Sequence, residues 1–363
     1  MKLYFSIVFA LLFAVYALNA RLDVAGIQTY GTVYELTTRQ GPSDLLVWPN
    51  LFDQRAWLKA KLEQKGCPER LILGSSTVGA LRQDSFPERP FVNGWMGAPT
   101  IEDFEATTAI LENSGCTPAE VLIGVDHWFV NANFNDKRWT SIAGDFASYQ
   151  LRRGRPWLAA PALARYWDTF KERLNFVTTR ESVVYLVKSA REHSWRTPPK
   201  LIAATPDEFC RTISSVYYIR SYDGHYTTCP VFASSAAAVH ATATAYVAAN
   251  GHQVRQWEQV DDQRIARLRQ VVRTLRRRGS AVTLLAPPFH PITYRNLMAD
   301  DHIRENFRAL DSLLTALALE ESASFVNLRD PASVGCGEDE FEDSHHGRPA
   351  CARKVAERLA RPQ

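Results

Sequence analysis

The sequence predicts an α/β fold of three layers, in which helices cover both faces of a doubly wound, five-stranded parallel sheet. Apolar runs of strand length alternate along the chain with segments of helical periodicity. The run at 121–126 is apolar and continuous, as in parallel strands that are buried on both faces. Alternation of this kind requires right-handed crossovers, which place helices on both sides of the sheet. With 363 residues, of which 46% are hydrophobic, the chain is long enough for one large domain that carries an insertion.

The first residues have the layout of an export signal. Lys2 precedes an uncharged run at positions 3–18, and Asn-Ala-Arg follows at positions 19–21. The run is about 16 residues long, shorter than the ~20 that span a bilayer. Leu18 is unfavourable three positions before a cut after Ala20, so residues 1–20 are predicted to be either a cleaved signal peptide or a retained signal anchor. In both cases we expect the rest of the chain to be extracytoplasmic, either periplasmic or secreted.

The first half of the sheet is predicted from three strands separated by helices. Residues 21–50 are rich in turn formers, so we expect them to lie on the surface as a lead-in. The elements that follow are a helix over 54–65, a strand at about 70–75, a strand at 91–97, a helix over 101–114 capped by Thr100, and a strand at 121–126.

Residues 127–255 interrupt the alternation and are predicted to be a large insertion after the third strand, which is a candidate lid. The elements that follow it are a helix capped by Asp261 or Asp262 that ends at Gly279, a strand at 281–286, a helix over 302–320, a strand at 324–328 and a last helix from near Arg348. No repeat and no linker divides residues 21–363, so we expect a single domain. An open parallel sheet of five strands in this arrangement is flavodoxin-like.

Six cysteines are typical of an oxidising compartment. Cys67 lies seven residues before Gly74, and Cys116 lies eight residues before Gly124. If both glycines end neighbouring parallel strands, the two cysteines meet at the opposite edge of the sheet. Cys336 and Cys351 bracket a C-terminal loop, which leaves Cys210 to pair with Cys229. No Cys-x-x-Cys spacing exists, so the sequence gives no indication of a zinc site.

A serine and a distant Asp/His pair favour nucleophilic catalysis. The strand at 70–75 stops at Gly74, and Ser75 and Ser76 follow at the edge where ligands bind in open α/β sheets. Gly-Ser-Ser also makes an ordinary turn. Asp343 and His346 lie in one loop before the last helix and can supply a base and the carboxylate that orients it.

Two alternatives remain open within these same segments. Ser75 replaces Ser76 as the nucleophile if the turn is displaced by one residue. His345 can likewise take the place of His346 as the base. An acidic surface loop with two incidental histidines is the alternative without catalysis.

At this point the chain resembles the SGNH (GDSL-type) hydrolase superfamily. It is most similar to the exported branch that includes alginate O-acetyltransferases and the teichoic-acid D-alanine transfer protein. The similarity covers most of residues 67–360. The residues that carry it are Leu73-Gly74-Ser75-Ser76, Asn93 to Gly97 with Ala98, Gly124-Val125-Asp126, Pro287-Pro288-Phe289 and Asp343-Ser344-His345-His346.

The resemblance implies a role for each of these residues. Ser76 would be the nucleophile, His346 the base and Asp343 the residue that orients it, while the backbone N–H groups of Ser76 and Gly97 would donate to the oxyanion. The third block of the family usually ends in Asn, whose amide also donates, whereas this chain has Asp126. An ionised carboxylate cannot donate and repels the developing charge. Asp126 is therefore expected to be protonated, to bind substrate, or to mark a weak or inactive enzyme.

Three further residues are candidates for the same cleft. His290 and His127 each follow a predicted strand at the same sheet edge and can line the cleft, although histidines in such positions are more often packing or loop residues. Asp223 lies in an Asp-Gly segment similar to one of the exported branch, which implies contact with substrate.

The predicted function is that of an exported serine esterase or O-acyltransferase that acts on an acyl ester of a glycan or another envelope component. No metal and no organic cofactor is expected. The first alternative is a catalytically silent SGNH-like domain that binds glycan or a partner in an envelope assembly, and the second is a flavodoxin-like binding protein without serine chemistry. A net charge of +3 gives no indication of nucleic-acid binding. Membrane contact is expected only through an uncleaved N-terminal anchor.

Overall fold

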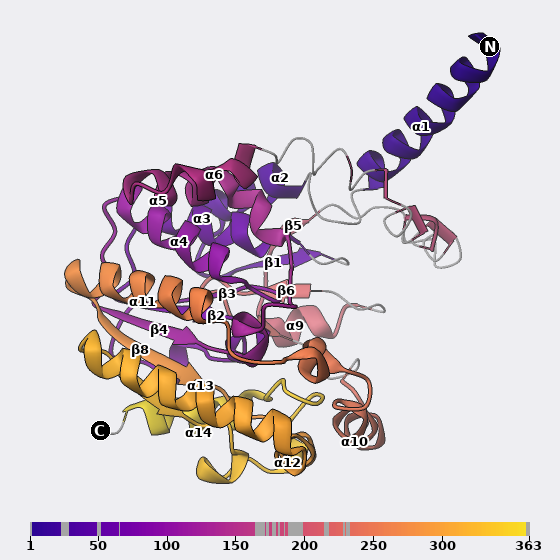
Figure 1. Cartoon of the computed structure of the whole chain (residues 1–363). Coiled ribbons are helices and arrows are strands. Elements are labelled where there is room, and N and C mark those ends of the chain that lie inside the picture. The colour runs from indigo at the N-terminus through magenta and orange to yellow at the C-terminus, as the bar shows by residue number, and fades with distance from the viewer. Residues whose placement is uncertain are drawn as a thin grey trace.

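The structure, a computed structural model, is built around a five-stranded parallel sheet in the order β3-β2-β4-β8-β9 (Figure 1). The residues it describes are 2–22, 29–48, 52–64, 66–163, 199–213, 218–227 and 233–360, together with Cys229 and a few positions between 171 and 187. All four neighbouring pairs of strands are parallel, which confirms the predicted fold class. The strands are β2 (Arg70–Gly74), β3 (Phe91–Trp95), β4 (Glu120–Gly124), β8 (Ala281–Ala286) and β9 (Ser324–Asn327).

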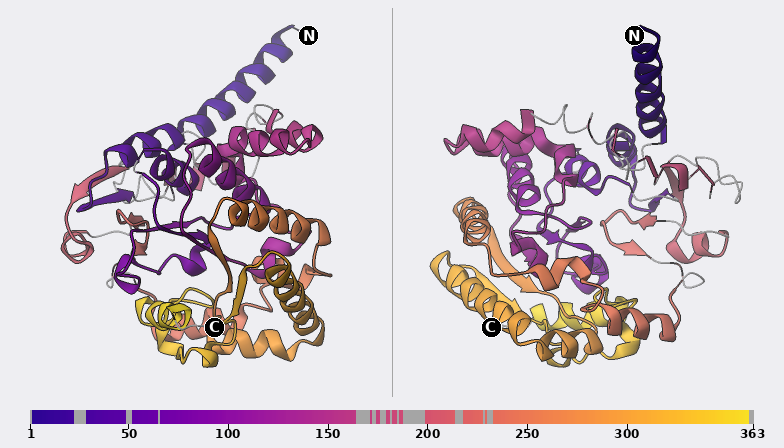
Figure 2. Two further views of the ribbon diagram at one scale, coloured as in Figure 1. Left: turned by 90° about the vertical axis from the view of Figure 1, so that its left-hand side faces the viewer. Right: turned by 45° about the vertical axis from the view of Figure 1, so that its right-hand side comes forward.

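Helices cover both faces of this sheet (Figures 1 and 2). In β2, Leu71 and Leu73 belong to the larger apolar cluster on one face, whereas Ile72 belongs to the smaller cluster on the other. The first face is covered by α3 (Gln54–Gln64), α4 (Ile101–Asn113), α11 (Asp262–Arg277) and α13 (Asp301–Glu320), and the second by α14 (Pro349–Ala360) and short helical turns. Asp261, rather than Asp262, caps α11 by accepting from two backbone N–H groups. The helix α12 (Pro291–Ala299) was not expected from the sequence.

A second, antiparallel sheet joins the lead-in to the insertion. Its order is β5-β1-β6-β7, with β1 (Asp44–Trp48) between β5 (Lys200–Ala203) and β6 (Tyr218–Arg220), and β7 (Tyr226–Thr227) beside β6. The expectation that residues 21–50 form a surface lead-in is therefore wrong for 44–48. Leu45, Leu46 and Val47 are at most 3% exposed, because strands from far along the chain cover them.

The hairpin of β6 and β7 covers the open edge of the main sheet at β3. The Asn93 N–H donates to the Asp223 carbonyl (2.7 Å), and the Trp95 indole N–H donates to the Gly224 carbonyl (2.9 Å). The buried Arg220 donates from Nη2 to the Asn93 carbonyl (2.9 Å). An uncovered edge strand leaves backbone groups free to pair with other chains, so the hairpin protects β3.

The rest of the insertion is largely helical in its described parts. It separates β4 from α11 in the chain, and its function as a lid stays a prediction. Its elements are η3 (His127–Val130), η4 (Arg138–Ile142), α5 (Ala143–Arg152), α6 (Pro156–Leu163), α9 (Pro206–Cys210), α10 (Ala236–Ala245) and η6 (Gly251–Gln256).

The N-terminal residues form helix α1 (Lys2–Leu22), which projects from the rest of the molecule, and α2 (Thr29–Arg39) follows it (Figures 1 and 2). Among the residues described, no helix is both long enough and apolar enough to cross a membrane. The assignment of residues 1–20 to an export signal stays a prediction.

All three predicted disulfides are present. Cys67 pairs with Cys116, Cys210 with Cys229, and Cys336 with Cys351. Cys67 and Cys116 precede β2 and β4, whose parallel pairing brings them together at the amino edge of the sheet. Three disulfides indicate that the protein matures in an oxidising compartment.

Candidate active site

The candidate nucleophile lies where β2 ends at the carboxyl edge of the sheet. A tight helical turn, η1 (Ser76–Val78), follows, and the Ser75 hydroxyl caps it by accepting from the Thr77 N–H (3.1 Å). Ser75 is fully buried, whereas Ser76 is partly exposed. Ser75 therefore has a structural function in the turn, and Ser76 is the serine whose hydroxyl contacts His346.

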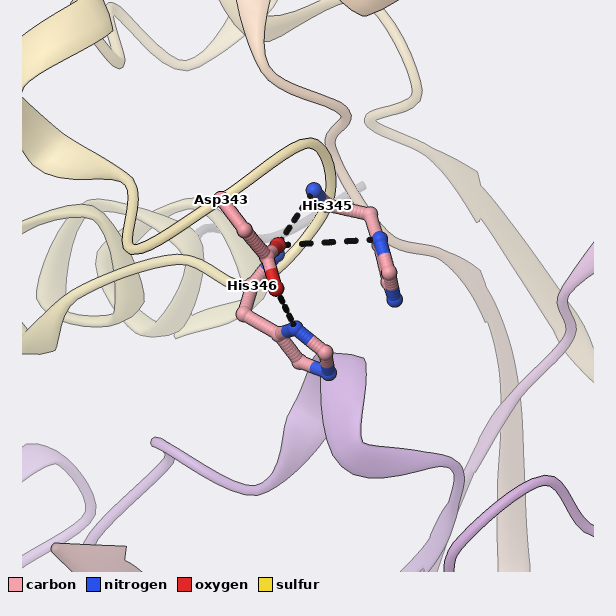
Figure 3. Close-up of side chains that lie close together, drawn as sticks. All are labelled: Asp343, His345 and His346. Atoms are coloured by element: carbon pink, nitrogen blue, oxygen red, sulfur yellow. Dashed lines mark hydrogen bonds and ion pairs between the residues drawn. The ribbon is translucent and has the colours of Figure 1, made fainter. Parts of the chain in front are cut away.

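Ser76, His346 and Asp343 form a continuous chain of hydrogen bonds. The Ser76 Oγ lies 2.7 Å from His346 Nε2, and His346 Nδ1 lies 2.6 Å from Asp343 Oδ2. With Nδ1–H donating to the carboxylate, Nε2 is left as an acceptor for the serine proton, which is the tautomer that general-base catalysis requires. In Figure 3 the His346 ring points from the C-terminal loop toward a turn of the earlier chain.

The loop that carries the Asp/His pair is held by its own backbone. Asp343 Oδ1 accepts from the backbone N–H groups of His345 and His346, each at 2.9 Å. Phe341 and Gly347 form an antiparallel bridge across the base of the loop. The Cys336–Cys351 disulfide joins the segments on either side of it.

The electrostatics of the pair suit a base and the carboxylate that orients it. Burial raises the pKa of Asp343, but the hydrogen bond from His346 and the neighbouring histidine charges lower it below its ordinary value overall. Burial lowers the pKa of His346, yet the hydrogen bond to Asp343 and its charge raise it above the ordinary 6.5. Asp343 is thus ionised throughout the pH range in which His346 titrates.

His345, the alternative base, does not contact Ser76. Its Nδ1 lies 2.8 Å from the Ser344 hydroxyl, and its buried ring packs against Trp128, Tyr246 and His252. Burial lowers its pKa well below 6.5. The geometry therefore favours His346 as the base.

Asp343, His345 and His346 also form a group that could hold a metal ion (Figure 3). Their ligand atoms lie within 4.8 Å of one another. However, Asp343 Oδ2 already accepts from His346, and His346 Nε2 already contacts Ser76. Metal binding would break both hydrogen bonds, so the observed arrangement fits serine chemistry better.

Two backbone N–H groups, those of Ser76 and Gly97, were predicted to donate to the oxyanion, and only that of Ser76 lacks a partner among the described residues. Within the described residues the Ser76 N–H has no hydrogen-bond partner. The Gly97 N–H donates to Gln54 Oε1 (3.1 Å), so Gln54 takes the place that a substrate oxygen would have. The expectation that Gly97 donates to an oxyanion is therefore not met in this arrangement, because the α3 side chain of Gln54 takes its N–H.

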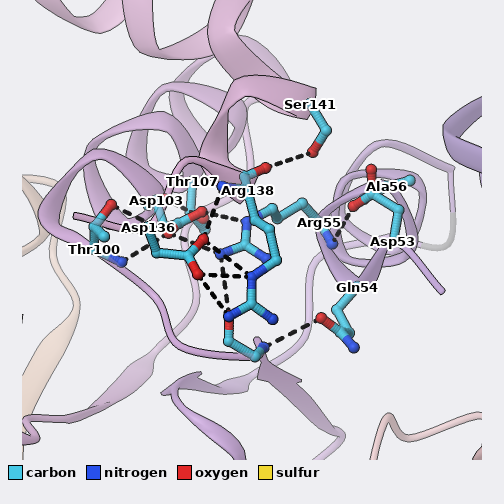
Figure 4. A network of polar contacts seen from close by, with 11 residues as sticks. Asp53, Gln54, Arg55, Ala56, Thr100, Asp103, Thr107, Asp136, Arg138 and Ser141 are labelled. Carbon is cyan, nitrogen blue, oxygen red and sulfur yellow. Dashed lines mark hydrogen bonds and ion pairs between the residues drawn. The ribbon is translucent and has the colours of Figure 1, made fainter. Parts of the chain in front are cut away.

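A buried polar network holds the segment around Gly97 (Figure 4). Arg55 donates to the buried carboxylate of Asp103 from Nε (2.6 Å) and to the Gly97 carbonyl from Nη2 (3.3 Å). The Arg138 guanidinium, paired with Asp136, lies where a Gly97 side chain would be. These contacts hold Gly97, and a side chain added there would displace the end of Arg138.

Asp126, at the position where the resemblance predicts Asn, is buried beside the serine turn. The Thr77 hydroxyl donates to Asp126 Oδ1 (3.3 Å). Burial raises the pKa of Asp126 to about 6, although hydrogen bonds from Ser75 and Thr77 act in the opposite direction. The side chain is therefore an acceptor for Thr77 and carries a charge at neutral pH.

His290 and Asp223, the predicted substrate-binding residues, have structural contacts instead. His290 is 1% exposed, and its Nδ1 caps α12 by accepting from Ile292 N–H (3.1 Å). Asp223 accepts from His225 Nδ1 (2.7 Å) and from Gln83 N–H (2.9 Å). Burial of His290 and the internal hydrogen bonds of both side chains use groups that would have met a substrate.

His127 is also buried rather than cleft-lining. It is 1% exposed, and neither ring nitrogen has a hydrogen-bond partner among the described residues. Burial lowers its pKa well below 6.5, so the ring is neutral. Its neighbours are aromatic rings, including those of Trp257 and Phe307.

Sequence reasoning missed the aromatic group beside the triad. Trp128, Tyr246 and His252 come from different parts of the insertion and surround the His345 ring. The sequence around them has no motif spacing, because their proximity depends on how the insertion folds back on the sheet. No protein-family model matches the chain, and no curated protein is similar to it.

Proposed function

We propose that the protein is a serine esterase or O-acyltransferase that uses Ser76, His346 and Asp343. The observation that carries the proposal is the hydrogen-bond chain from Ser76 through His346 to Asp343, with contacts of 2.7 and 2.6 Å. A nucleophile bonded to a base that is in turn oriented by a carboxylate is the arrangement that activates a serine.

The reaction is an acyl transfer in two steps. Ser76 Oγ attacks the carbonyl carbon of the ester while His346 Nε2 takes the serine proton. The proton then passes from His346 to the leaving alcohol, and an acyl-enzyme remains. In the second step water or a sugar hydroxyl gives its proton to His346 and attacks the acyl carbon. The bond from this carbon to Ser76 Oγ then breaks, and His346 returns the proton to Oγ.

The disulfides support the location in this proposal, and the substrate class is inferred from that location. The three disulfides support a site of action outside the cytoplasm, in the periplasm or after secretion. An ester of a glycan or another envelope component is the substrate class that suits this location. Attachment through an uncleaved N-terminal segment belongs to the same proposal.

The test is the Ser76→Ala variant, with Ser75→Ala as its matched control. We expect Ser76→Ala to lose turnover of 4-nitrophenyl acetate by on the order of 10³-fold or more, since the nucleophile is removed. Ser75→Ala should retain turnover, apart from the effect of a lost cap on stability. A fluorophosphonate reagent should label the wild type at Ser76 only. Equal turnover by Ser76→Ala and the wild type would exclude this function.

A silent SGNH-like domain is the second candidate, and two contacts favour it. Asp126 is a buried carboxylate where an amide donor is expected, and the Gly97 N–H is taken by Gln54. Such a protein would bind a glycan or an envelope partner without turnover. A folded wild-type protein that the fluorophosphonate leaves unlabelled would support this candidate over the first.

A further inference from the structure

The segment before α11 has an unusual backbone close to the triad. Asn250, His252 and Gln253 all have left-handed backbone conformations, with φ of 55°, 49° and 58°. Residues other than glycine adopt this conformation rarely, and they keep it only where the surrounding structure holds them. Conformations of this kind cluster at functional sites, so the contacts of this segment are informative.

The His252 ring lies between the two loops that flank Ser76. It stacks on Trp128, in the loop after β4, with ring centroids 4.1 Å apart and planes 21° apart. It also lies nearly perpendicular to the ring of His345, the neighbour of the base His346, with centroids 4.9 Å apart and planes 87° apart. Trp128 follows Asp126 by two residues, so the ring on which His252 stacks belongs to the loop that carries Asp126.

Tyr246 fixes the tautomer of His252. Its hydroxyl lies 2.9 Å from His252 Nδ1 and has no other partner among the described residues. Tyr246 is 6% exposed, and a buried hydroxyl proton without an acceptor is costly. The tyrosine therefore donates to Nδ1, which leaves the proton of the neutral imidazole on Nε2.

The Nε2–H group of His252 is available to a ligand. It has no hydrogen-bond partner in the described part of the chain, and the ring is partly exposed. Burial and the charges of His346 and Arg138 lower the pKa of His252 to about 4, against the opposite effect of Asp343. The ring is thus a neutral donor at neutral pH, and it does not compete with His346 for the substrate proton.

We propose that His252 is a catalytic residue whose Nε2–H donates to the carbonyl oxygen of the acyl group as it becomes an oxyanion. It takes the place of the amide that Asp126 does not supply, and it acts together with the free N–H of Ser76. The inference rests on the function proposed above. A neutral imidazole held as a donor is an established means of polarising a carbonyl.

The test compares three variants that differ in whether a hydrogen-bond donor remains at the position of His252 Nε2. His252→Asn keeps a residue that tolerates the left-handed backbone but whose amide is too short to reach the Nε2 position. His252→Gln places an amide N–H near that position. Gln253→Asn is the matched control, because Gln253 has the same backbone conformation and directly follows His252.

We expect kcat for 4-nitrophenyl acetate to fall about 10²-fold in His252→Asn with little change in KM, as for other lost oxyanion donors. The kcat of His252→Gln should be at least about tenfold higher than that of His252→Asn. The kcat of Gln253→Asn should match that of the wild type. His252→Asn within about threefold of the wild type, a loss confined to KM, or no recovery in His252→Gln would each overturn the inference.

Fluorophosphonate labelling separates this inference from the proposed function. If the wild type is not labelled, the proposed function itself fails. If the wild type is labelled and His252→Asn is labelled at the same rate, only the inference fails. Because His252 stays neutral beside His346, Asp343 and Arg138, its loss should lower kcat equally from about pH 6 to pH 9. A loss confined to one end of this range would contradict a neutral donor.

Discussion

At the scale of single residues, Asp126 and His346 need opposite conditions to act. Asp126 is a hydrogen-bond donor only when protonated, below a pKa that burial raises to about 6. His346 is a base only when neutral, above a pKa that Asp343 raises beyond 6.5. Few molecules therefore hold both forms at one pH. A protonated Asp126 is thus a poor explanation for how this site stabilises an oxyanion.

The variant Asp126→Asn tests the cost of this carboxylate. We expect it to raise kcat about tenfold or more, because it removes a negative charge from the oxyanion side and restores the amide of the family pattern. The Asn oxygen can still accept from Thr77. Asp126→Ala is the control that removes the charge without adding a donor, and it should gain less. An unchanged kcat for Asp126→Asn would contradict the expected cost of the carboxylate, and a lower kcat would show that the carboxylate is needed for catalysis.

The pH dependence of the reaction should follow His346. Burial lowers its pKa, but Asp343, Glu342 and Asp126 raise it above 6.5 overall, so the base is lost as the pH falls through this raised value. We expect kcat/KM of the wild type to decrease as the pH falls, with the midpoint of this decrease above pH 6.5. This midpoint should move to lower pH in Asp126→Asn, since the variant lacks one of the negative charges that raise the pKa of His346. An unchanged midpoint would exclude an electrostatic interaction between Asp126 and His346.

At the scale of elements, the β6–β7 hairpin connects the edge of the sheet to the triad. Tyr226 N–H donates to the Gly79 carbonyl (3.1 Å) just after the serine turn, and its hydroxyl donates to Glu342 (3.1 Å) just before Asp343. The turn of the hairpin depends on Gly224, whose φ is +91°. A side chain there would meet the Asn93 carbonyl oxygen at 2.1 Å.

Gly224→Ala should therefore destabilise the protein strongly. We expect a loss of about 3 kcal/mol in the free energy of unfolding, from the clash with a backbone oxygen and from the left-handed conformation together. Gly115→Ala is the control, since Gly115 has φ +67° but no atom within 4 Å of an added Cβ. It should lose only about 1 kcal/mol. Urea unfolding of both variants measures the difference, and equal losses would mean that the hairpin does not need this close approach.

At the scale of the whole molecule, the sequence predicted the main sheet because short, mainly apolar runs alternate with helical segments. The pairing of Cys67 with Cys116 followed from that sheet, since parallel strands bring their preceding residues to one edge. The proximity of Ser76 and His346 could be predicted from the same topology and from the resemblance. Their catalytic function stays a prediction.

The remaining features depend on contacts that no local pattern encodes. The strand β1 is only five residues long, and its partners lie far along the chain. The burial of His290, the engagement of Gly97 by Gln54 and the position of His252 all depend on how side chains pack after the sheet has formed. Sequence reasoning found the edge where the site lies, but not which groups at that edge remain free.

The second sheet also constrains the order in which the protein can fold while it is being made. Its strand β1 needs β5 and β6 on either side, and these are synthesised only after the whole first half of the main sheet. At about 5–20 residues per second, Leu45, Leu46 and Val47 wait for several seconds or more before their partners exist. During that interval a short apolar strand has two unsatisfied edges. Both edges are covered only when β5 and then the hairpin of β6 and β7 have emerged.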